Sequence, residues 1–471
     1  MTEPRDPYSP ERRTALLFTG TGADGAYHAG VLRALHEAGV KIDVVGGRGV
    51  GALAAILAAV DGGSALWEAN GFWRGPAVPA LYKWRWPFAA LRWLGLGLVA
   101  ILAIPAAVLL LSVLVYAIAL VLGMAGLESG ARLVAGFVEL LRAAFSPEAL
   151  PTWIPRLATL AATAALITLT LGAWLAWWRS PLHRRSTGSR FWSLLGSPID
   201  ARPAIHAATE AVWRLLKGGA AIKTPDPADL SRRYSELLQE NVGQPGFREL
   251  MLIAHDLDAG RDMVFGLVRD PFRRALFPTA PGVSTARRAE AHDLGSGTQA
   301  LLADVLAASL SLPGVSDERL VRFAPDSYWR GETHRLTDRP GSVGRLLEEA
   351  AAAGVEQVMV VSASAEAPGP HELRPPRLDG IGRIGEHLAS ADASALTDAV
   401  RHLHHRFQGL YVIRPAHNPV RPLDLQGTYD EQSDRLQSLD ELMERGYEDA
   451  YRQFIEPFLG ASGERMLSSG Q

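Results

Sequence analysis

The chain has 471 residues, a formal net charge of −3 and no cysteine. The small net charge gives no basic field for nucleic-acid binding, and the lack of cysteine excludes disulfides, thiolate metal sites and cysteine nucleophiles. The length allows two or three domains of ~150 residues. Residues 1–13 are polar and contain three prolines, so we expect a disordered start without a secretory signal.

The first part of the chain alternates short apolar runs with glycine turns and helical stretches. Residues 14–19 predict a buried strand, and residues 42–45 predict a second one. The turn G-T-G-A-D-G and a helix over residues 26–39 connect them, and another helix starts at Val50. Strand, turn and helix repeated in this order predict an α/β domain with a mostly parallel sheet, whose first part covers residues 14–82.

Two long segments without charged residues follow. Residues 93–127 and 157–178 contain no Asp, Glu, Lys or Arg. A membrane-spanning helix needs ~20 apolar residues, so these runs predict a transmembrane hairpin in residues 83–192, with spans at about 94–122 and 157–178. A pair of buried core helices is the alternative interpretation.

The charges beside these runs predict an orientation. Lys83, Arg85 and Arg92 precede the first run, and four arginines at positions 179, 184, 185 and 190 follow the second. Because basic flanks stay in the cytoplasm, we expect both termini inside, at a bacterial inner membrane, and residues 128–156 outside. Part of that outer loop, residues 133–145, has the pattern of an amphipathic helix lying on the membrane surface.

The strand pattern resumes after the membrane segment. Residues 193–429 contain predicted strands at 249–256, 261–268, 355–362 and 410–413, and an amphipathic helix at 298–312. Residues 430–471 form a charged tail for which we expect helix. Neither half has enough strands for its own sheet, so both halves should build one domain. The chain must then return to the side it left, which requires an even number of membrane crossings.

The first glycine turn has two interpretations. Gly20, Gly22 and Gly25 fit G-x-G-x-x-G, and Asp43 follows at about the distance of the acidic residue in a dinucleotide site. In such sites, however, the acidic residue ends the second strand. Asp43 precedes Val44 and Val45 and is therefore placed too early, which disfavours nucleotide binding.

The order of features resembles the patatin-like phospholipases. The stretches that carry the likeness are A-Y-H-A-G-V-L-R-A-L-H-E-A-G, L-I-A-H-D-L-D-A-G-R-D-M-V-F, L-A-A-S-L-S-L-P-G-V and V-E-Q-V-M-V-V-S, within residues 14–75 and 245–365. The resemblance implies a three-layer α/β domain and a glycine-rich oxyanion turn. It also implies a serine nucleophile in G-x-S-x-G, and a D-G-G/A aspartate as the serine's only partner. Such a dyad hydrolyses lipid esters.

The chain departs from that pattern at the implied site. The elbow reads Gly47, Arg48, Gly49, Val50 and Gly51, so glycine stands at the serine position. The D-G-G/A aspartate position matches Arg330, by the segment Y-W-R-G-E. The oxyanion turn comprises Gly20, Thr21, Gly22, Asp24 and Gly25, with Asp24 where the family has a basic residue. Glycine has no oxygen for covalent acyl transfer, and arginine does not accept a proton at neutral pH.

These departures predict a membrane-anchored, catalytically silent patatin-like protein that binds membrane lipid or a protein partner. The alternatives are an active lipid acyl hydrolase with a displaced nucleophile, and a scaffold whose cleft is filled by its own side chains. Candidate substitutes for the missing dyad are Thr19, Thr21, Asp326, Glu332, His334 and Asp338, although no nucleophile–base spacing stands out. His402, His404 and His405 fit a solvated helix face better than a metal site. We expect no metal, cofactor or nucleic acid.

Overall fold

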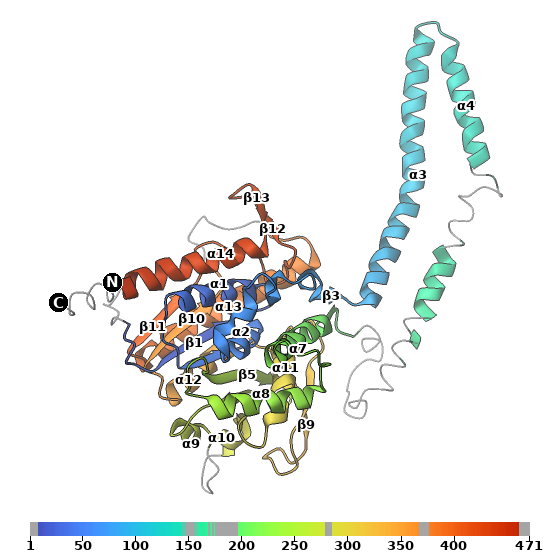
Figure 1. The fold of residues 1–471 in the computed structure, drawn as a ribbon. Helices are drawn as coiled ribbons and strands as arrows, with labels where there is room; N and C mark the ends of the chain where they lie inside the picture. Colours follow the sequence, from blue (N-terminus) through green and yellow to red (C-terminus); the bar gives the residue numbers. More distant parts are fainter. Residues whose placement is uncertain are drawn as a thin grey trace. The chain divides into compact units, whose positions relative to one another are not determined.

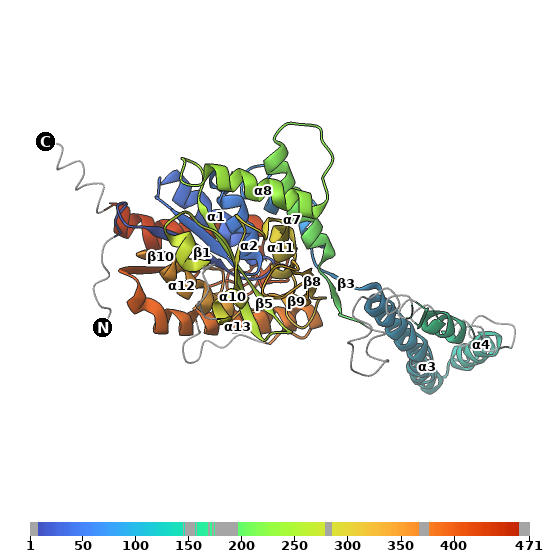
Figure 2. The same cartoon turned by 90° about the horizontal axis from the view of Figure 1, so that it is seen from below.

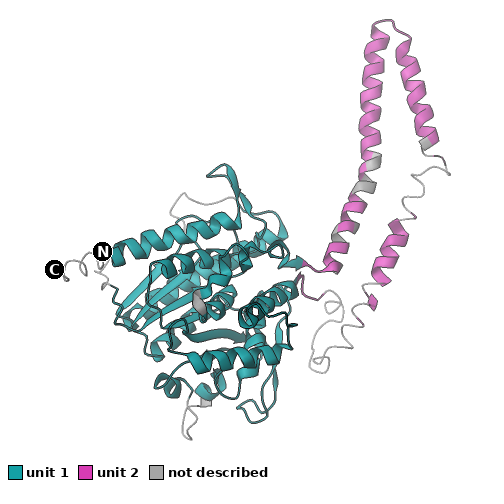
Figure 3. Cartoon of the chain, in the orientation of Figure 1, with its two compact units in different colours: residues 1–83, 200–471 teal, residues 84–199 magenta. Residues whose placement is uncertain are grey.

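The computed structural model describes residues 8–144, 146, 156, 158–167, 170–171, 174, 196–277, 285–366 and 376–460. The chain divides into two compact units, which Figure 3 distinguishes by colour. Unit 1 comprises Met1–Lys83 and Asp200–Gln471, and unit 2 comprises Trp84–Ile199.

A nine-stranded sheet forms the centre of unit 1 (Figure 1). Its main path runs in the order β11-β10-β1-β2-β5-β6-β7, and β9 pairs with both β5 and β8. The pairs from β11 to β5 along this path are parallel, whereas β5 and β6 are antiparallel. The strands are β1 (Thr14–Thr19), β2 (Val44–Gly47), β5 (Glu249–Asp256), β6 (Arg261–Leu267), β7 (Ala291–Asp293), β8 (Arg319–Arg322), β9 (Thr333–Thr337), β10 (Gln357–Ser362) and β11 (Gly409–Ile413).

Helices cover both faces of this sheet (Figure 2). Helices α1, α2, α11 and α14 lie over one face, and α12 and α13 cover the other. The helices of unit 1 are α1 (Asp24–Glu37), α2 (Val50–Ala58), α7 (Arg202–Lys217), α8 (Pro227–Asn241), α9 (Phe272–Leu276), α10 (Thr285–Glu290), α11 (Leu302–Ser309), α12 (Ser342–Ala352), α13 (Gly380–Leu403) and α14 (Leu439–Ala450).

The alternating side chains of the central strands build two hydrophobic cores. In β1, Leu16 and Phe18 join one core, while Ala15 and Leu17 join the other. Neighbouring side chains of a strand point to opposite faces, so a strand covered on both faces is apolar throughout. This explains why β1 and β10 appear in the sequence as continuous apolar runs.

The predicted α/β fold with a mostly parallel sheet is confirmed, with some local differences. The helix expected over residues 298–312 is shorter, because a 3-10 turn (Gln299–Leu301) precedes α11. The tail from residue 430 is not helical throughout. Strands β12 (Thr428–Asp430) and β13 (Arg435–Gln437) form an antiparallel hairpin before α14, and a π-helix (Tyr451–Gly460) follows α14. Cross-strand pairing thus replaces helix where the tail begins.

Unit 2 is dominated by α3 (Trp86–Met124), a helix of 39 residues, followed by α4 (Ser129–Ala144). Strands β3 (Lys83–Trp84) and β4 (Ile199–Asp200) pair with each other at the ends of this segment. Within the described residues, one helix is long and apolar enough to cross a membrane, at Ala106–Met124.

Of the two predicted membrane spans, only the first is therefore supported. The run at residues 157–178 lies largely outside the described residues, and its described part contains a shorter apolar helix, Ala158–Ile167. The amphipathic helix expected in the outer loop is present as α4. It packs against α3 rather than standing alone.

Candidate functional site

The elbow between β2 and α2 has glycine at its tip. Gly49 lies between the end of β2 and the first residue of α2, with φ 58° and ψ −138°. L-residues with a side chain rarely adopt this backbone conformation, and forcing one into it costs about 1–3 kcal/mol. A Cβ atom at Gly49 would lie 2.1 Å from the carbonyl oxygen of Gly20 and 3.0 Å from Oδ2 of Asp338. The space for a nucleophile's side chain is thus filled by backbone.

Hydrogen bonds hold this closed arrangement. The N–H of Val50 donates to the carbonyl oxygen of Gly20 at 3.0 Å, and the N–H of Arg48 donates to that of Phe18 at 3.1 Å. The flanking glycines allow close approach, because a Cβ at Gly51 would lie 2.5 Å from the carbonyl oxygen of Phe18. The elbow is therefore fastened to the β1–α1 turn.

The predicted oxyanion turn uses its own N–H groups internally. The N–H of Thr21 donates to Oδ2 of Asp24 at 2.8 Å. The N–H of Ala23 donates to the carbonyl oxygen of Pro422 at 2.8 Å, and a Cβ at Gly22 would lie 2.0 Å from that same oxygen. In an acyl hydrolase such N–H groups must point at the oxygen that becomes negative. Here the Thr21 N–H donates to the Asp24 carboxylate and the Ala23 N–H donates to the Pro422 carbonyl, so neither points at a substrate oxygen.

A buried ion cluster lies directly behind the elbow. The guanidinium of Arg48 is fully buried; its Nη1 donates to Oδ1 of Asp392 at 2.5 Å and its Nε to Oδ1 of Asp338 at 3.1 Å. Asp392 comes from the middle of α13 and Asp338 follows β9, so the cluster joins three elements distant in sequence. The hydroxyl of Thr19 donates to Asp392 at 3.3 Å.

The balance of charge in this cluster shifts the pKa values of its carboxyl groups. Burial raises the pKa of Asp24 to about 7, and the nearby Asp392 adds to the rise. Burial also raises the pKa of Asp338 to about 7, against the opposing attraction of Arg48. Burial alone would lower the pKa of Arg48, but Asp338 and Asp392 raise it above its usual value. One guanidinium faces several buried carboxyls, so the uncompensated carboxyls favour the protonated form.

The structure brings Asp338, rather than Arg330, to the elbow. Arg330 lies in the turn between β8 and β9, is exposed and has φ 46°. Asp338 follows the other end of β9 and is buried. Because a strand rises ~3.3 Å per residue, the length of β9 separates the two positions. The assignment of Arg330 to the position of the dyad aspartate is therefore not supported by the geometry.

The other candidate substitutes are buried or lie away from the elbow. The hydroxyls of Thr19 and Thr21 are buried within the ion cluster. His334 bonds through Nδ1 to Oδ2 of Asp256 at 2.6 Å and through Nε2 to Glu332 at 3.3 Å, and its ring packs on Trp329. That histidine is thus part of the β5–β9 packing. Asp326 is exposed in the β8–β9 turn, and His402, His404 and His405 are exposed at the end of α13.

Metal binding and nucleotide binding are the two other kinds of site that the sequence brought into question. Within the described residues, no group of three or more His, Asp or Glu side chains is arranged to hold a metal ion. Asp43, the acidic residue of the nucleotide alternative, lies at the amino end of β2, whereas the glycine turns lie at the carboxyl ends of β1 and β2. Its carboxylate accepts the N–H of Thr14 at 2.9 Å and pairs with Lys41.

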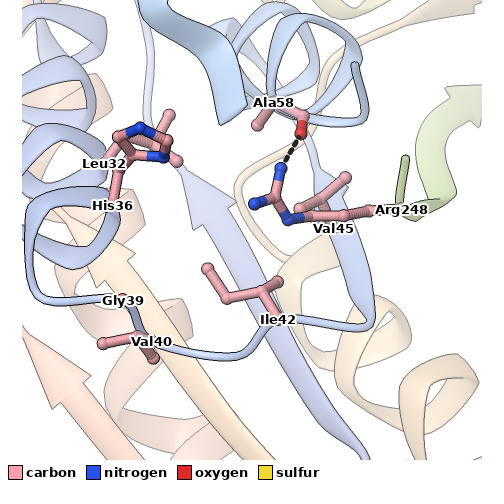
Figure 4. A pocket seen from close by; sticks show the side chains of 8 residues that line it. All are labelled: Leu32, His36, Gly39, Val40, Ile42, Val45, Ala58 and Arg248. Carbon is pink, nitrogen blue, oxygen red and sulfur yellow. Dashed lines mark hydrogen bonds between the residues drawn. The ribbon is translucent and has the colours of Figure 1, made fainter. Parts of the chain in front are cut away.

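Two cavities also lie at the amino end of β2. One of about 230 Å³ is lined by residues of the α1–β2 connection, the end of α2 and Arg248 (Figure 4). There Arg248 donates to the carbonyl oxygen of Ala58 at 2.7 Å, which completes the carboxyl end of α2 (Figure 4). A second cavity of about 370 Å³ adjoins it near Gly243–Arg248. These hollows are separated from the elbow by the length of β2.

Sequence reasoning found the glycines of the site and named Asp338 as a candidate, but it paired neither Asp338 nor Asp392 with Arg48. Asp338 stands directly after the alternating strand T-H-R-L-T, and this position at a strand's carboxyl end was the available signal. Asp392 gives no comparable signal, since it is one polar residue within a helix of 24 residues. Its role depends on how α13 packs.

A known protein family matches most of the chain. The family described as Patatin-like phospholipase matches residues 16–338. Among solved structures, VipD from Legionella pneumophila is similar with 12% sequence identity and a TM-score of 0.33, over 94% of this chain and 67% of that chain. No curated protein sequence gave a significant match. The family match extends over more than half of the sequence and includes both glycine turns and Asp338, so the chain belongs to the patatin-like phospholipase family.

Proposed function

We propose that this protein is a membrane-anchored member of the patatin-like family that has lost hydrolysis and acts by binding. Its α/β unit keeps the family frame, while α3 holds it at the inner face of the membrane. There it binds membrane lipid or a protein partner. We also infer that Asp338 stands where the family's dyad aspartate stands, because it is the carboxylate nearest to a Cβ at Gly49.

The observation that carries the proposal is the geometry at Gly49. A missing serine alone would leave an empty position, open to a neighbouring hydroxyl or a bound water. Here the carbonyl oxygen of Gly20 lies 2.1 Å from the place where a Cβ would be, so backbone occupies the position. Nucleophilic catalysis needs an activated oxygen within reach of the substrate's carbonyl carbon. Backbone carbonyls do not supply one.

Three further features support the loss of hydrolysis. Asp24 accepts the Thr21 N–H at 2.8 Å, so that N–H is not open to a substrate oxyanion. Arg48 binds Asp338 at 3.1 Å, which competes with any role of this carboxylate as a base. Finally, the cluster is buried, so an ester group would have to displace protein atoms to reach it.

The proposed anchoring rests on the composition and exposure of α3. Leu110, Val113 and Leu120 are exposed on this helix within Ala106–Met124. A helix of this length rises ~28 Å at 1.5 Å per residue, which matches the ~30 Å hydrocarbon layer. Exposed apolar side chains around a whole helix are unfavourable in water and favourable in lipid.

The experiment that tests the loss of hydrolysis uses the purified full-length chain in detergent. It is incubated with a fluorescent fluorophosphonate and, separately, with short-chain p-nitrophenyl esters and phospholipid vesicles. We expect no covalent labelling and no turnover above that of heat-denatured protein. An adduct mapped by mass spectrometry to a side chain at the elbow, with turnover abolished by Thr21→Ala or Glu332→Ala, would overturn the proposal in favour of a displaced nucleophile.

Anchoring is tested on membranes from cells that express the full-length chain. Integral proteins resist alkaline carbonate, whereas peripheral proteins are released. We expect the chain to stay in the membrane pellet after carbonate and to leave it only with detergent. Complete release by carbonate would contradict anchoring by α3 without affecting the conclusion about hydrolysis.

A further inference from the structure

Helices α3 and α4 meet along a regular line of side chains. Within Ala106–Met124 of α3 the less exposed residues are Val108, Ser112, Val115, Ala119 and Leu122. On α4 they include Gly130, Val134, Phe137 and Leu141, with Val138 beside Phe137. The steps of four and three residues in the α3 set and from Gly130 through Val134 and Phe137 to Leu141 are those of a coiled-coil seam. The connection between them is short, so they pack as an antiparallel hairpin (Figure 1).

A close contact at Gly130 fixes the register of this hairpin. A Cβ at Gly130 would lie 2.7 Å from the carbonyl oxygen of Ala119, so only glycine allows this approach. Counting outward in opposite directions from this pair places Phe137 level with Ser112, and Leu141 level with Val108. The hydroxyl of Ser112 donates to the carbonyl oxygen of Val108 at 2.8 Å, so it needs no partner from α4.

The part of α3 that α4 flanks is the apolar candidate span. The seam runs from Val108 to Leu122, and the span runs from Ala106 to Met124. Away from the seam, Leu110 is 73% exposed and Met124 is 83% exposed. A lipid layer that covers these side chains must therefore also surround α4, because α4 lies beside them along the same length of α3.

We propose that unit 2 enters the membrane as a helical hairpin of two crossings, in which α4 returns at the depth of Ala106–Met124. The chain after Ala144 then emerges on the side from which α3 entered. This inference rests on the proposed anchoring by α3. It differs from the topology expected from the sequence, in which residues 128–156 lie outside.

The charges of α4 lie at defined depths in this placement. The register puts Arg142 level with Ala107, at one end of the span, and Arg132 level with Ala117, about 10 Å from the other end at 1.5 Å per residue. Arg142 can extend its charged group to the headgroups, whereas Arg132 must reach outward along the helix to do so. Glu139 precedes Arg142 by three residues, a spacing at which opposite charges on a helix attract.

The hairpin also satisfies the connectivity of unit 1. Strands β1 and β2 precede unit 2, and β5 and β10 follow it, yet all four belong to one sheet. The chain must therefore return to the side it left. A descent along α3 and a return along α4 accomplish this.

The absence of cysteine makes a labelling test direct. Single cysteines are introduced as Gly126→Cys in the α3–α4 turn, Ser146→Cys after α4, and Gly260→Cys in unit 1. Intact cells are treated with a membrane-impermeant maleimide before and after permeabilisation. We expect Gly126→Cys to react in intact cells, and Ser146→Cys and Gly260→Cys to react only after permeabilisation. Labelling of Ser146→Cys in intact cells, to the same extent as Gly126→Cys, would overturn the hairpin of two crossings.

A cross-linking pair tests the seam independently. We expect the double variant Val115→Cys/Val134→Cys to form an intramolecular disulfide in oxidised membranes, because the register places these residues level on facing sides. The control Leu110→Cys/Val134→Cys uses an exposed position off the seam and should remain reduced. Equal cross-linking of both pairs would contradict the packing.

The failure of anchoring itself gives a different result. If α3 does not insert, carbonate releases the chain, and Gly126→Cys, Ser146→Cys and Gly260→Cys all need permeabilisation. That pattern would overturn the proposed anchoring and, with it, the hairpin. Retention in the membrane with labelled Ser146→Cys overturns only the hairpin.

Discussion

Replacing Gly49 by serine tests whether the site is closed or merely lacks a hydroxyl. The substitution restores G-x-S-x-G and brings the new side chain towards Asp338, whose Oδ2 lies 3.0 Å from the Cβ position. If the loss of serine were the only defect, Gly49→Ser would produce a working dyad. We expect instead that the variant is destabilised and inactive.

The size of the effect follows from two contributions. A side chain at φ 58° and ψ −138° costs about 1–3 kcal/mol in backbone strain. Contact with the Gly20 oxygen at 2.1 Å forces the β1–α1 turn to move, and overpacking of this kind typically costs about 1–3 kcal/mol. Together the free energy of unfolding should fall by about 2–6 kcal/mol.

The assay compares this variant with Gly260→Ser. Gly260 also has a positive φ of 64°, but a Cβ there would meet no atom within 4 Å. Thermal unfolding of both variants in detergent should therefore show a larger loss for Gly49→Ser, and the difference reports the closed turn. Fluorophosphonate labelling should stay absent in both variants. If Gly49→Ser were as stable as the parent chain and became labelled, the account of a site closed by backbone would be refuted.

Four further results are expected. Arg48→Met should reduce stability in thermal unfolding by about 3–5 kcal/mol, because it leaves buried carboxylates unpaired. Adding Asp392→Leu to this variant should recover part of the loss. An Arg48→Met variant as stable as the parent chain would contradict this reasoning. Stability should fall as pH rises from 5 to 8. The pKa values of Asp24 and Asp338 are about 7 in the folded state, above those of the unfolded chain, so the folded state holds extra protons that it loses in this window. Asp24→Asn should reduce the slope of the free energy of unfolding against pH by up to ~1.4 kcal/mol per pH unit. Gly30→Ala should destabilise the protein by about 1–3 kcal/mol, since its Cβ would lie 1.8 Å from the Met443 carbonyl oxygen where α1 meets α14. Gly344→Ala on α12 meets only ordinary contacts and should gain up to ~1 kcal/mol from helix propensity. Equal melting temperatures of the two variants would refute this contrast. Leu114→Arg on α3 should lower the fraction of the protein that resists carbonate extraction, because a charge in the hydrocarbon layer costs about 2.5–3.5 kcal/mol. The control Leu436→Arg, at an exposed position on β13, should not change this fraction. Unchanged membrane retention of both variants would contradict the insertion of α3.

Local patterns in the sequence were sufficient to predict much of the fold. β1 and β10 are covered on both faces, so their inner residues, Ala15–Phe18 and Val358–Val361, are apolar and the strands were visible as continuous runs. The elbow was visible because a strand, a glycine turn and a helix follow one another directly along the chain. The tail after residue 430 was misjudged because its charged residues suit both helix and hairpin. The pairing of Thr428–Asp430 with Arg435–Gln437 decided between them.

The sequence by itself determined that Gly49 has no nucleophilic oxygen, since this depends only on which residue stands at the tip of the elbow. Only the tertiary structure decided which side chains face that tip. Asp338 and Asp392 meet Arg48 because β9 and α13 converge behind the elbow, from positions roughly 300 residues away in the chain. Contacts over such separations depend on the packing of whole elements. The partner of α3 is its neighbour in the sequence, but the packing of the two helices became apparent only from the register fixed by Gly130 and Ala119.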